Sequence, residues 1–446
     1  MGEAAKISLK AIGKQDTYLL SDDPDESFFN YATNKRHSEF RKYHRNKNVV
    51  NPGTKTTWPF GETIKVQFNP RNMGDLLSNM YLSITMPGIG DYASNKNYAD
   101  QLGRHILKSV TMYVDDIEVE KIDDDWGIIY DELYLEISEK VANRFLVNRN
   151  LGYDDAPTNA SVAQYDSDLV IPIHFFFSRK FAGDEYGTNK PNRPYFPICA
   201  IYKQKIEFEF EFHKQTFFTN TNDTLTLQSF NVVTEEITVS PEERKFLTSE
   251  RQTMITDLVR KHPSIVSDLN RNVIRNNLVP NIPVKCIHWF IRNEAFENAD
   301  DAEGTGSGGE YLYENRFNFS ATLDFQGENT TLYPIMKDAT FYINGNKLPN
   351  VTKTGHEYYK YLVPHHTRLS RPIRNIYTYS FSMNPVNVEP SGNLDFSAIQ
   401  SDKTNIEITL DTDSGIDIST ETFSLNMYYT GYQTFVFDQG FMSLAY

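Results

Sequence analysis

The chain has 446 residues, a formal net charge of −15 and a pI near 5.2. Nonspecific attraction to a phosphate backbone needs clustered Lys and Arg, so this charge argues against direct binding of a genome. Cys199 and Cys286 are the only cysteines, which excludes a disulfide framework and a cysteine-based metal site and favours folding in a reducing compartment.

Length alone predicts about two domains of ordinary size. No segment has the roughly 20 consecutive apolar residues that cross a bilayer. The first ten residues, MGEAAKISLK, lack the apolar core of a signal peptide. Lys6 stands where a myristoylation motif has Ser or Thr, so we do not expect a lipid anchor.

The first element in chain order is a basic arm, which we place at residues 1–47. Its one strongly basic stretch contains Lys35, Arg36, Arg41, Lys42, Arg45 and Lys47. Such a stretch is suited to an anionic surface, either lipid headgroups or acidic partner proteins. An ordinary solvated arm has the same composition, and the sequence leaves both interpretations open.

Alternating apolar and polar residues recur through the rest of the chain and predict half-buried β-strands. In the first half they lie in VQF (66–68), MYLSITM (80–86), VTMYV (110–114), VIPIHFFF (170–177) and IEFEFEF (206–212). In the second half they lie in VKCIHWFI (284–291), FNFSATLDF (317–325), ATFYI (339–343), YTYSFSM (377–383), IEITL (406–410) and FSLNMYY (423–429). Asn344-Gly345 predicts a tight hairpin turn. Aromatic residues make up 13% of the chain, mostly Phe and Tyr, which also favours an all-β fold.

Two helices are expected among the strands. Apolar residues three and four apart predict one amphipathic helix from Trp126, through Ile137 and Val141, to Phe145, capped by Asp123-Asp124-Asp125. Ser240-Pro241 opens a second one with a capping-box start, and apolar periodicity continues through Ile255 and Val259 until Pro263. The predicted division is an arm (1–47), a first β domain (48–239), a helical connector (240–281) and a second β domain (282–446).

Two long loops, 184–193 and 299–310, are rich in Gly, Asn and acidic residues and should lie at the surface. Sequons for N-glycosylation occur at Asn159, Asn222, Asn318, Asn329 and Asn350. In an Asn-rich chain several arise by chance, so they permit glycosylation without arguing for it.

Each candidate chemical motif has a simpler structural explanation. GTGSGG at Gly304 fits the dinucleotide pattern, but no strand precedes it and an acidic stretch would repel phosphate. Asp123, Asp124 and Asp125 can collect a divalent cation, yet such a run more often caps a helix. His365-His366 lacks a third ligand at metal-site spacing. The alternating Glu207, Glu209 and Glu211 resemble the solvated face of a strand.

No nucleophile elbow, zinc-protease motif or P-loop occurs. We therefore predict no catalytic residue, no metal and no cofactor. A pair of carboxylates for glycoside hydrolysis meets only in the fold, so the sequence leaves that alternative open.

Several motifs in a fixed order resemble the double jelly-roll major capsid proteins of nucleocytoplasmic large DNA viruses and related polinton-like viruses. They run from GKQDTYL (13–19) through residues 60–87 and 102–133, PEERKF (241–246) and residues 282–293, to RFNFS (316–320), INGNKL (343–348), PSGNLDFSAI (390–399) and residues 435–446. The residues after Gly392 differ from the family's usual serine-rich sequence. The loop that begins at Asp184 is longer than is usual in the family. Together the motifs span about 430 residues.

The resemblance implies two eight-stranded jelly-roll sandwiches, with a few short helices in the connections, and a homotrimeric, pseudo-hexagonal capsomer. Capsomers of this kind tile an icosahedral shell in the virion, assembled in the host cytoplasm. Expected partners are neighbouring capsomers, minor capsid and penton proteins, and an internal membrane. Residues 299–310 would face outward and the arm inward. A paralogous minor capsid or spike protein, or a carbohydrate-active β-sandwich enzyme, remains the alternative.

Overall fold

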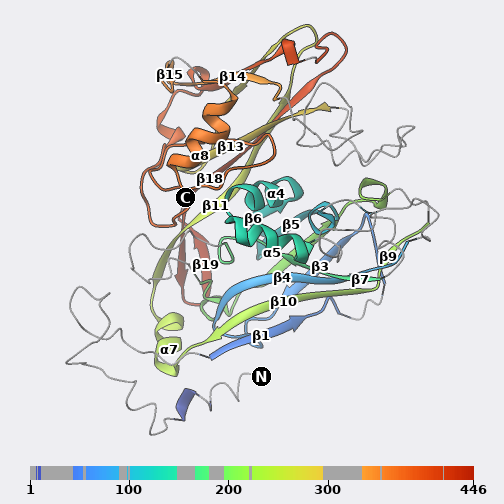
Figure 1. Cartoon of the computed structure of the whole chain (residues 1–446). Coiled ribbons are helices and arrows are strands. Elements are labelled where there is room, and N and C mark those ends of the chain that lie inside the picture. The colour runs from blue at the N-terminus through green and yellow to red at the C-terminus, as the bar shows by residue number, and fades with distance from the viewer. Residues whose placement is uncertain are drawn as a thin grey trace.

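A computed structural model describes residues 7, 9–11, 44–53, 57–89, 98, 101–147, 166–179, 195–219, 223–294, 334–351, 354–414 and 416–445. Its strands form two β-rich bodies, drawn one above the other in Figure 1, with the helices α4 and α5 lying between their labelled sheets. Each body contains a pair of sheets, which we call a sandwich; one sheet of the second body has five strands and the other three sheets have four.

The first sandwich is built from residues 44–238. One of its sheets, the β1 sheet, has the order β1-β10-β4-β7, and the other, the β3 sheet, has the order β3-β8-β5-β6. The strands are β1 (His44–Val50), β3 (Thr63–Phe68), β4 (Leu76–Met86), β5 (Leu107–Val114), β6 (Ile117–Asp123), β7 (Ser167–Pro172), β8 (Ile206–Phe212) and β10 (Ser229–Thr238). A short pair, β2 (Trp58–Pro59) with β9 (Thr226–Leu227), lies apart from them.

The second sandwich repeats this arrangement. The β11 sheet has the order β11-β18-β13-β16, with β19 added beside β18, and the β12 sheet has the order β12-β17-β14-β15. The strands are β11 (Gln252–Val266), β12 (Val273–Asn277), β13 (Val284–Asn293), β14 (Met336–Ile343), β15 (Asn346–Leu348), β16 (Tyr377–Ser380), β17 (Asn405–Leu410), β18 (Phe423–Asp438) and β19 (Phe441–Leu444). All ladders between these strands are antiparallel.

Aromatic side chains join the two sheets of each sandwich. Phe210 of β8 meets Phe230 of β10 edge to face, with ring centroids 5.4 Å apart. In the second sandwich Trp289 of β13 meets Phe341 of β14 at 5.5 Å. Ring pairs in this geometry add stabilisation beyond the area they bury. The predicted all-β fold of two sandwiches is confirmed.

The helix expected from Trp126 to Phe145 is two helices. α4 (Asp124–Leu133) ends where Tyr134 turns towards the second sandwich, and α5 (Ile137–Val147) begins after it. Every residue of α4 is buried. The second part of the prediction is wrong, because Ile137, Val141 and Phe145 are exposed rather than in the core.

The helix expected from Ser240 is confirmed only over α7 (Pro241–Ser249), where the Ser240 side chain accepts a hydrogen bond from the Glu243 amide. The continuation to Pro263 is wrong, since those residues form β11. The apolar residues of β11 do not alternate, because the middle of the strand, Thr256–Val259, is buried on both faces. Such a run has no clear strand period.

The remaining turns and helices agree in part with the sequence. Asn344 and Gly345 both adopt positive φ in the β14–β15 hairpin, as predicted. His365 and His366 end α8 (Val363–His366), which follows the π-helical turn η6 (Tyr358–Leu362). α3 (Leu102–His105) precedes β5. Within the described part of the chain, no helix has the length and apolar character to span a bilayer.

Candidate assembly surfaces and the junction between the sandwiches

The start of α4 forms the first contact between the sandwiches. Asp123 caps the helix by accepting from the Trp126 amide at 2.9 Å, as predicted, and its other oxygen accepts from Lys261 of β11 at 3.1 Å and from the Tyr428 hydroxyl of β18. Asp125 pairs with Arg292 of β13 at 2.7 Å, and both are fully buried. The acidic turn of the first sandwich therefore faces a cationic sheet of the second.

A second buried group of charges lies beside it. Glu120 of β6 pairs with Arg179 and accepts from the Val259 amide of β11 at 2.8 Å. Arg179 also donates to the Asp257 carbonyl at 2.9 Å, and Asp257 pairs with Lys285 of β13 at 3.1 Å. Burial alone would raise the pKa of Asp257, but Lys285 and Arg179 outweigh it and lower that pKa.

Aromatic groups complete the junction. Tyr134, just after α4, bonds His288 of β13 at 2.9 Å, and His288 bonds the Thr378 hydroxyl of β16 at 2.7 Å. The Trp126 ring lies 5.8 Å from the His288 ring and 5.9 Å from that of Tyr428. Burial lowers the pKa of His288 to about 3, so this imidazole is neutral at physiological pH.

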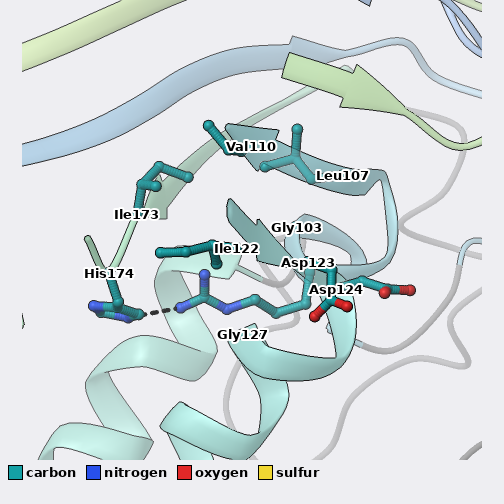
Figure 2. Close-up of a pocket in the computed structure, with 10 residues that line it drawn as sticks. Gly103, Leu107, Val110, Ile122, Asp123, Asp124, Gly127, Ile173 and His174 are labelled. Carbon is teal, nitrogen blue, oxygen red and sulfur yellow. Dashed lines mark hydrogen bonds between the residues drawn. The ribbon is translucent and has the colours of Figure 1, made fainter. Parts of the chain in front are cut away.

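A further buried pair holds α4 on its own sandwich. Arg104 of α3 pairs with Asp131 of α4 at 2.8 Å and bonds His174 at 3.0 Å. The cavity drawn in Figure 2, lined by Asp123, Asp124 and His174 among others, has a volume of about 20 Å³. Such a volume holds about one water molecule, so the cavity has no room for a substrate.

The three aspartates do not form a vacant metal site. Their carboxylate oxygens lie within 4.8 Å of one another, as in a cation site. Each, however, already has a protein partner: Lys261 for Asp123, His213 at 3.0 Å for Asp124, and Arg292 for Asp125. The capping interpretation made from the sequence therefore agrees with the geometry.

The larger cavity is a groove of about 280 Å³ beneath α7. Its lining residues are Leu76, Tyr195, Pro197, Leu247, Gln252, Thr253, Met254 and Phe437. The described residues that line it include no carboxylate, imidazole, thiol or cationic side chain. General acid–base catalysis needs such groups, so the groove offers a contact surface rather than an active site.

Two surfaces of the first sandwich are open. The outer face of the β1 sheet carries the row Val49, Val233, Tyr81 and Pro172 across its four strands, and it is only partly buried. We call it the open face. On α5, Ile137, Val141 and Phe145 are 81%, 55% and 44% exposed and form an apolar stripe, while Asn143 and Val147 face the protein. A surface helix normally turns its apolar residues toward the protein and its polar residues toward water.

The structure describes only some of the residues that the sequence analysis singled out. Arg45 and Lys47 lie on β1, so the strand begins before the predicted end of the arm at residue 47. Lys35, Arg36, Arg41 and Lys42 lie outside the described residues, as do residues 184–193, 299–310 and 316–320. Asn350 is exposed, whereas Asn159, Asn222, Asn318 and Asn329 lie outside the described residues.

Other residues are placed within the fold. Cys199 and Cys286 are both buried and unpaired, and burial raises the pKa of Cys199 to about 12. Glu207, Glu209 and Glu211 lie opposite buried Phe208, Phe210 and Phe212, as predicted. The ion pairs of the junction escaped sequence analysis, because Asp125 and Arg292 are 167 residues apart.

Family comparisons match nearly the whole chain. Residues 29–246 match the family described as major capsid protein N-terminus, and residues 242–443 match that described as large eukaryotic DNA virus major capsid protein. The chain belongs to the major capsid proteins of large eukaryotic DNA viruses. It is thus a component of the virion capsid, and the resemblance inferred from its motifs is confirmed.

Solved capsid structures share the fold. A PBCV-1 VP54 structure fitted into a reconstruction of the virophage Sputnik is 16% identical, with a TM-score of 0.69 over 92% of this chain and 98% of that one. A quasi-atomic model of the PBCV-1 virus capsid is 15% identical, with a TM-score of 0.68 over 92% and 98%. The Faustovirus major capsid protein is 12% identical, with a TM-score of 0.63 over 90% and 91%. No curated protein sequence matches the chain.

Proposed function

We propose that three copies of this capsid protein close into a pseudo-hexagonal capsomer that tiles an icosahedral shell. The observation that carries the proposal is the apolar stripe of α5, which a solitary chain leaves in water. Exposed apolar stripes of this kind mark protein–protein contacts. A surface patch that meets a different patch on the next copy generates a closed ring when the rotation allows it.

The test is the mass of the purified full-length chain in solution, combined with negative-stain electron microscopy. A particle of three times 51.5 kDa with a hexagonal outline is the expected result. A chain that stays at 51.5 kDa at micromolar concentration would contradict the proposal. The same preparation should hydrolyse no polysaccharide, because we infer a structural role without catalytic activity, as in the family.

The inner and outer sides of the capsomer are also inferred. We propose that the arm, with Lys35, Arg36, Arg41 and Lys42, faces inward onto minor capsid and penton proteins or an internal membrane. Clustered cations suit acidic partners or anionic headgroups. Residues 299–310 would then face outward, and assembly would occur in the host cytoplasm.

We retain the division into an arm, a first jelly roll, a connector and a second jelly roll as a proposal. Its connector is best restricted to α7, because β11 pairs with β18 along the second sandwich. The first boundary is best placed before His44, where β1 begins. Limited proteolysis that cuts near residues 240–251 and leaves two stable fragments would support this division.

A further inference from the structure

A lysine and an asparagine meet in the interior of the second sandwich. Lys360 lies on the π-helical turn η6, Asn375 lies just before β16, and the two residues are only 5% and 4% exposed. Lys360 Nζ donates to Asn375 Oδ1 at 2.8 Å and to the Ile373 carbonyl at 3.0 Å. π-Helical turns are rare and often occur at functional sites. The contact therefore joins two buried polar groups at an unusual turn of the backbone.

Two costs of burial stay uncompensated in this contact. Both hydrogen-bond partners that Lys360 has in the described part of the chain are neutral oxygens, whereas buried Lys285 pairs with the Asp257 carboxylate at 3.1 Å. On the other side, Asn375 Nδ2 is buried and has no hydrogen-bond acceptor among the described residues. A buried charge that lacks a paired counter-charge and a buried donor that lacks an acceptor are both unfavourable.

The surroundings of Lys360 favour its neutral amine. Burial and the Arg371 guanidinium lower the pKa of Lys360 to about 8, from an ordinary value of 10.5, and the charge of Glu132 offsets them only in part. At pH 7 about a tenth of the chains therefore carry the uncharged amine at this position. An uncharged lysine amine is a nucleophile towards carbonyl carbon.

The carbonyl carbon of Asn375 is within reach of this amine. A C=O bond is about 1.23 Å long, so the hydrogen bond to Oδ1 places Lys360 Nζ at most about 4 Å from Asn375 Cγ. Attack needs a separation of about 3–3.5 Å, which a small rotation of the lysine side chain supplies. A carboxamide is a weak electrophile in water, but two groups held together in this way react as if at about 10⁵ M or more.

We propose that Lys360 and Asn375 join in an intramolecular isopeptide bond. The lysine ammonium first loses a proton to water, and the lone pair of Nζ attacks Asn375 Cγ. The Nζ–Cγ bond forms, the Cγ–Nδ2 bond breaks, and one proton passes from Nζ to Nδ2, which leaves as ammonia. The product has neither the buried charge nor the buried donor without an acceptor. This step goes beyond the capsomer proposed above and does not depend on it.

The bond closes a loop, residues 360–375, that holds the first sandwich. Within this loop the Ser370 amide donates to the Leu133 carbonyl at the end of α4 at 2.7 Å. The Ile373 amide donates to Glu132 Oε2, also on α4, at 2.8 Å. A covalent cross-link reduces the number of conformations open to the unfolded loop. The isopeptide bond therefore stabilises the segment by which the second sandwich grips α4.

The test is the intact mass of the purified full-length chain, measured by mass spectrometry under denaturing conditions. The wild type should be lighter than its sequence by one ammonia molecule. Lys360→Arg, which keeps the positive charge, and Asn375→Ala should each have the mass of their own sequence. The matched control is Asn276→Ala, because Asn276 is also buried but its amide donates to the Pro263 carbonyl at 3.0 Å. This control should still lose one ammonia.

A tryptic digest of the wild type locates the bond, since ammonia is also lost when an asparagine cyclises onto its own backbone. The expected product is a branched peptide in which residues 354–368 are joined to residues 375–403, with no cleavage after Lys360. A wild type of full sequence mass that is cleaved after Lys360 would overturn the proposal, and so would an ammonia loss that maps to another asparagine. Both outcomes are read on the wild type, so they hold even if a variant fails to fold.

Discussion

Arg292, near the end of β13, donates to Asp125 at the start of α4 over 2.7 Å, and neither side chain is more than 3% exposed. The two residues belong to different sandwiches, so their ion pair fixes how the sandwiches meet. Removing one partner of such a pair leaves the other charge buried and uncompensated.

Arg292→Met should therefore lower the free energy of unfolding by about 3–5 kcal/mol. The measurement is urea denaturation followed by circular dichroism and tryptophan fluorescence. The control is Arg275→Met, which breaks the largely exposed pair with Glu407 and should cost under about 1 kcal/mol. Asp125→Asn added to Arg292→Met should restore part of the loss, and equal costs for Arg292 and Arg275 would contradict the prediction.

The junction should also respond to acid through His288. Burial lowers its pKa to about 3 in the folded chain, against an ordinary value of 6.5. Below pH 6.5 the unfolded chain binds a proton that the folded chain does not, so stability falls as the pH falls towards 3. Between pH 7 and pH 5 this one group should account for about 2 kcal/mol.

Protonation of the other junction groups changes the free energy of unfolding in both directions. The contribution of His288 must therefore be measured by comparing the wild type with a variant that lacks this imidazole. His174 acts in the same sense as His288, because burial lowers its pKa to about 4, whereas burial raises the pKa of Glu120 and Asp123. The unfolding free energy of His288→Gln should drop by about 2 kcal/mol less than that of the wild type between pH 7 and pH 5. Exposed His366→Gln should behave as the wild type, and equal drops in all three proteins would contradict the assignment.

The α5 stripe should matter to assembly and not to folding. Ile137→Ser, Val141→Ser and Phe145→Ser change exposed positions, where each substitution usually alters stability by no more than about 0.5 kcal/mol. The triple variant should unfold at nearly the wild-type urea concentration yet lose the three-chain particle, as measured by analytical ultracentrifugation. A three-chain particle with the wild-type dissociation behaviour would exclude the stripe from the capsomer contact.

The arm should act after the capsomer has formed. Deletion of residues 1–43 keeps all of β1 and should leave the three-chain particle intact while preventing normal shells, as seen by electron microscopy of assembly reactions. Charge reversal at Lys35, Arg36, Arg41 and Lys42 should have the same effect if the arm works by electrostatics. Normal shells from the deletion variant would rule out the proposed role.

The strands could be predicted wherever one face meets the core and the other meets water. β8 is an example, because its Glu and Phe residues alternate and the structure keeps that alternation. The helix expected over β11 is wrong because the middle of this strand is buried on both faces, so its apolar residues do not alternate with exposed polar ones. Apolar and polar residues alternate along a strand only when one of its faces is exposed to water. A strand covered on both faces therefore lacks the alternation by which a strand is predicted.

The orientation of α5 was beyond sequence analysis for a related reason. The spacing of Ile137, Val141 and Phe145 correctly predicts a helical stripe, but it does not say which body the stripe contacts. Tyr134 breaks the helix to reach His288, and α5 then turns its apolar side outward. The ion pairs of the junction could not be predicted from the sequence either, since a contact such as that of Asp123 with Lys261 joins residues 138 positions apart.

The late position of β18 in the sequence determines when the β11 sheet and the junction can form during synthesis. This strand of 16 residues lies beside both β11 and β13, and it comes late in the sequence. Until the ribosome has released Phe423–Asp438, β11 has no neighbour in its sheet and the Tyr428 hydroxyl is not there to meet Asp123. The strands of the first sandwich are all synthesised earlier, since β10 ends at Thr238. The acids of its α4 turn then stay hydrated until the late strand arrives, so a prematurely terminated chain cannot close the junction.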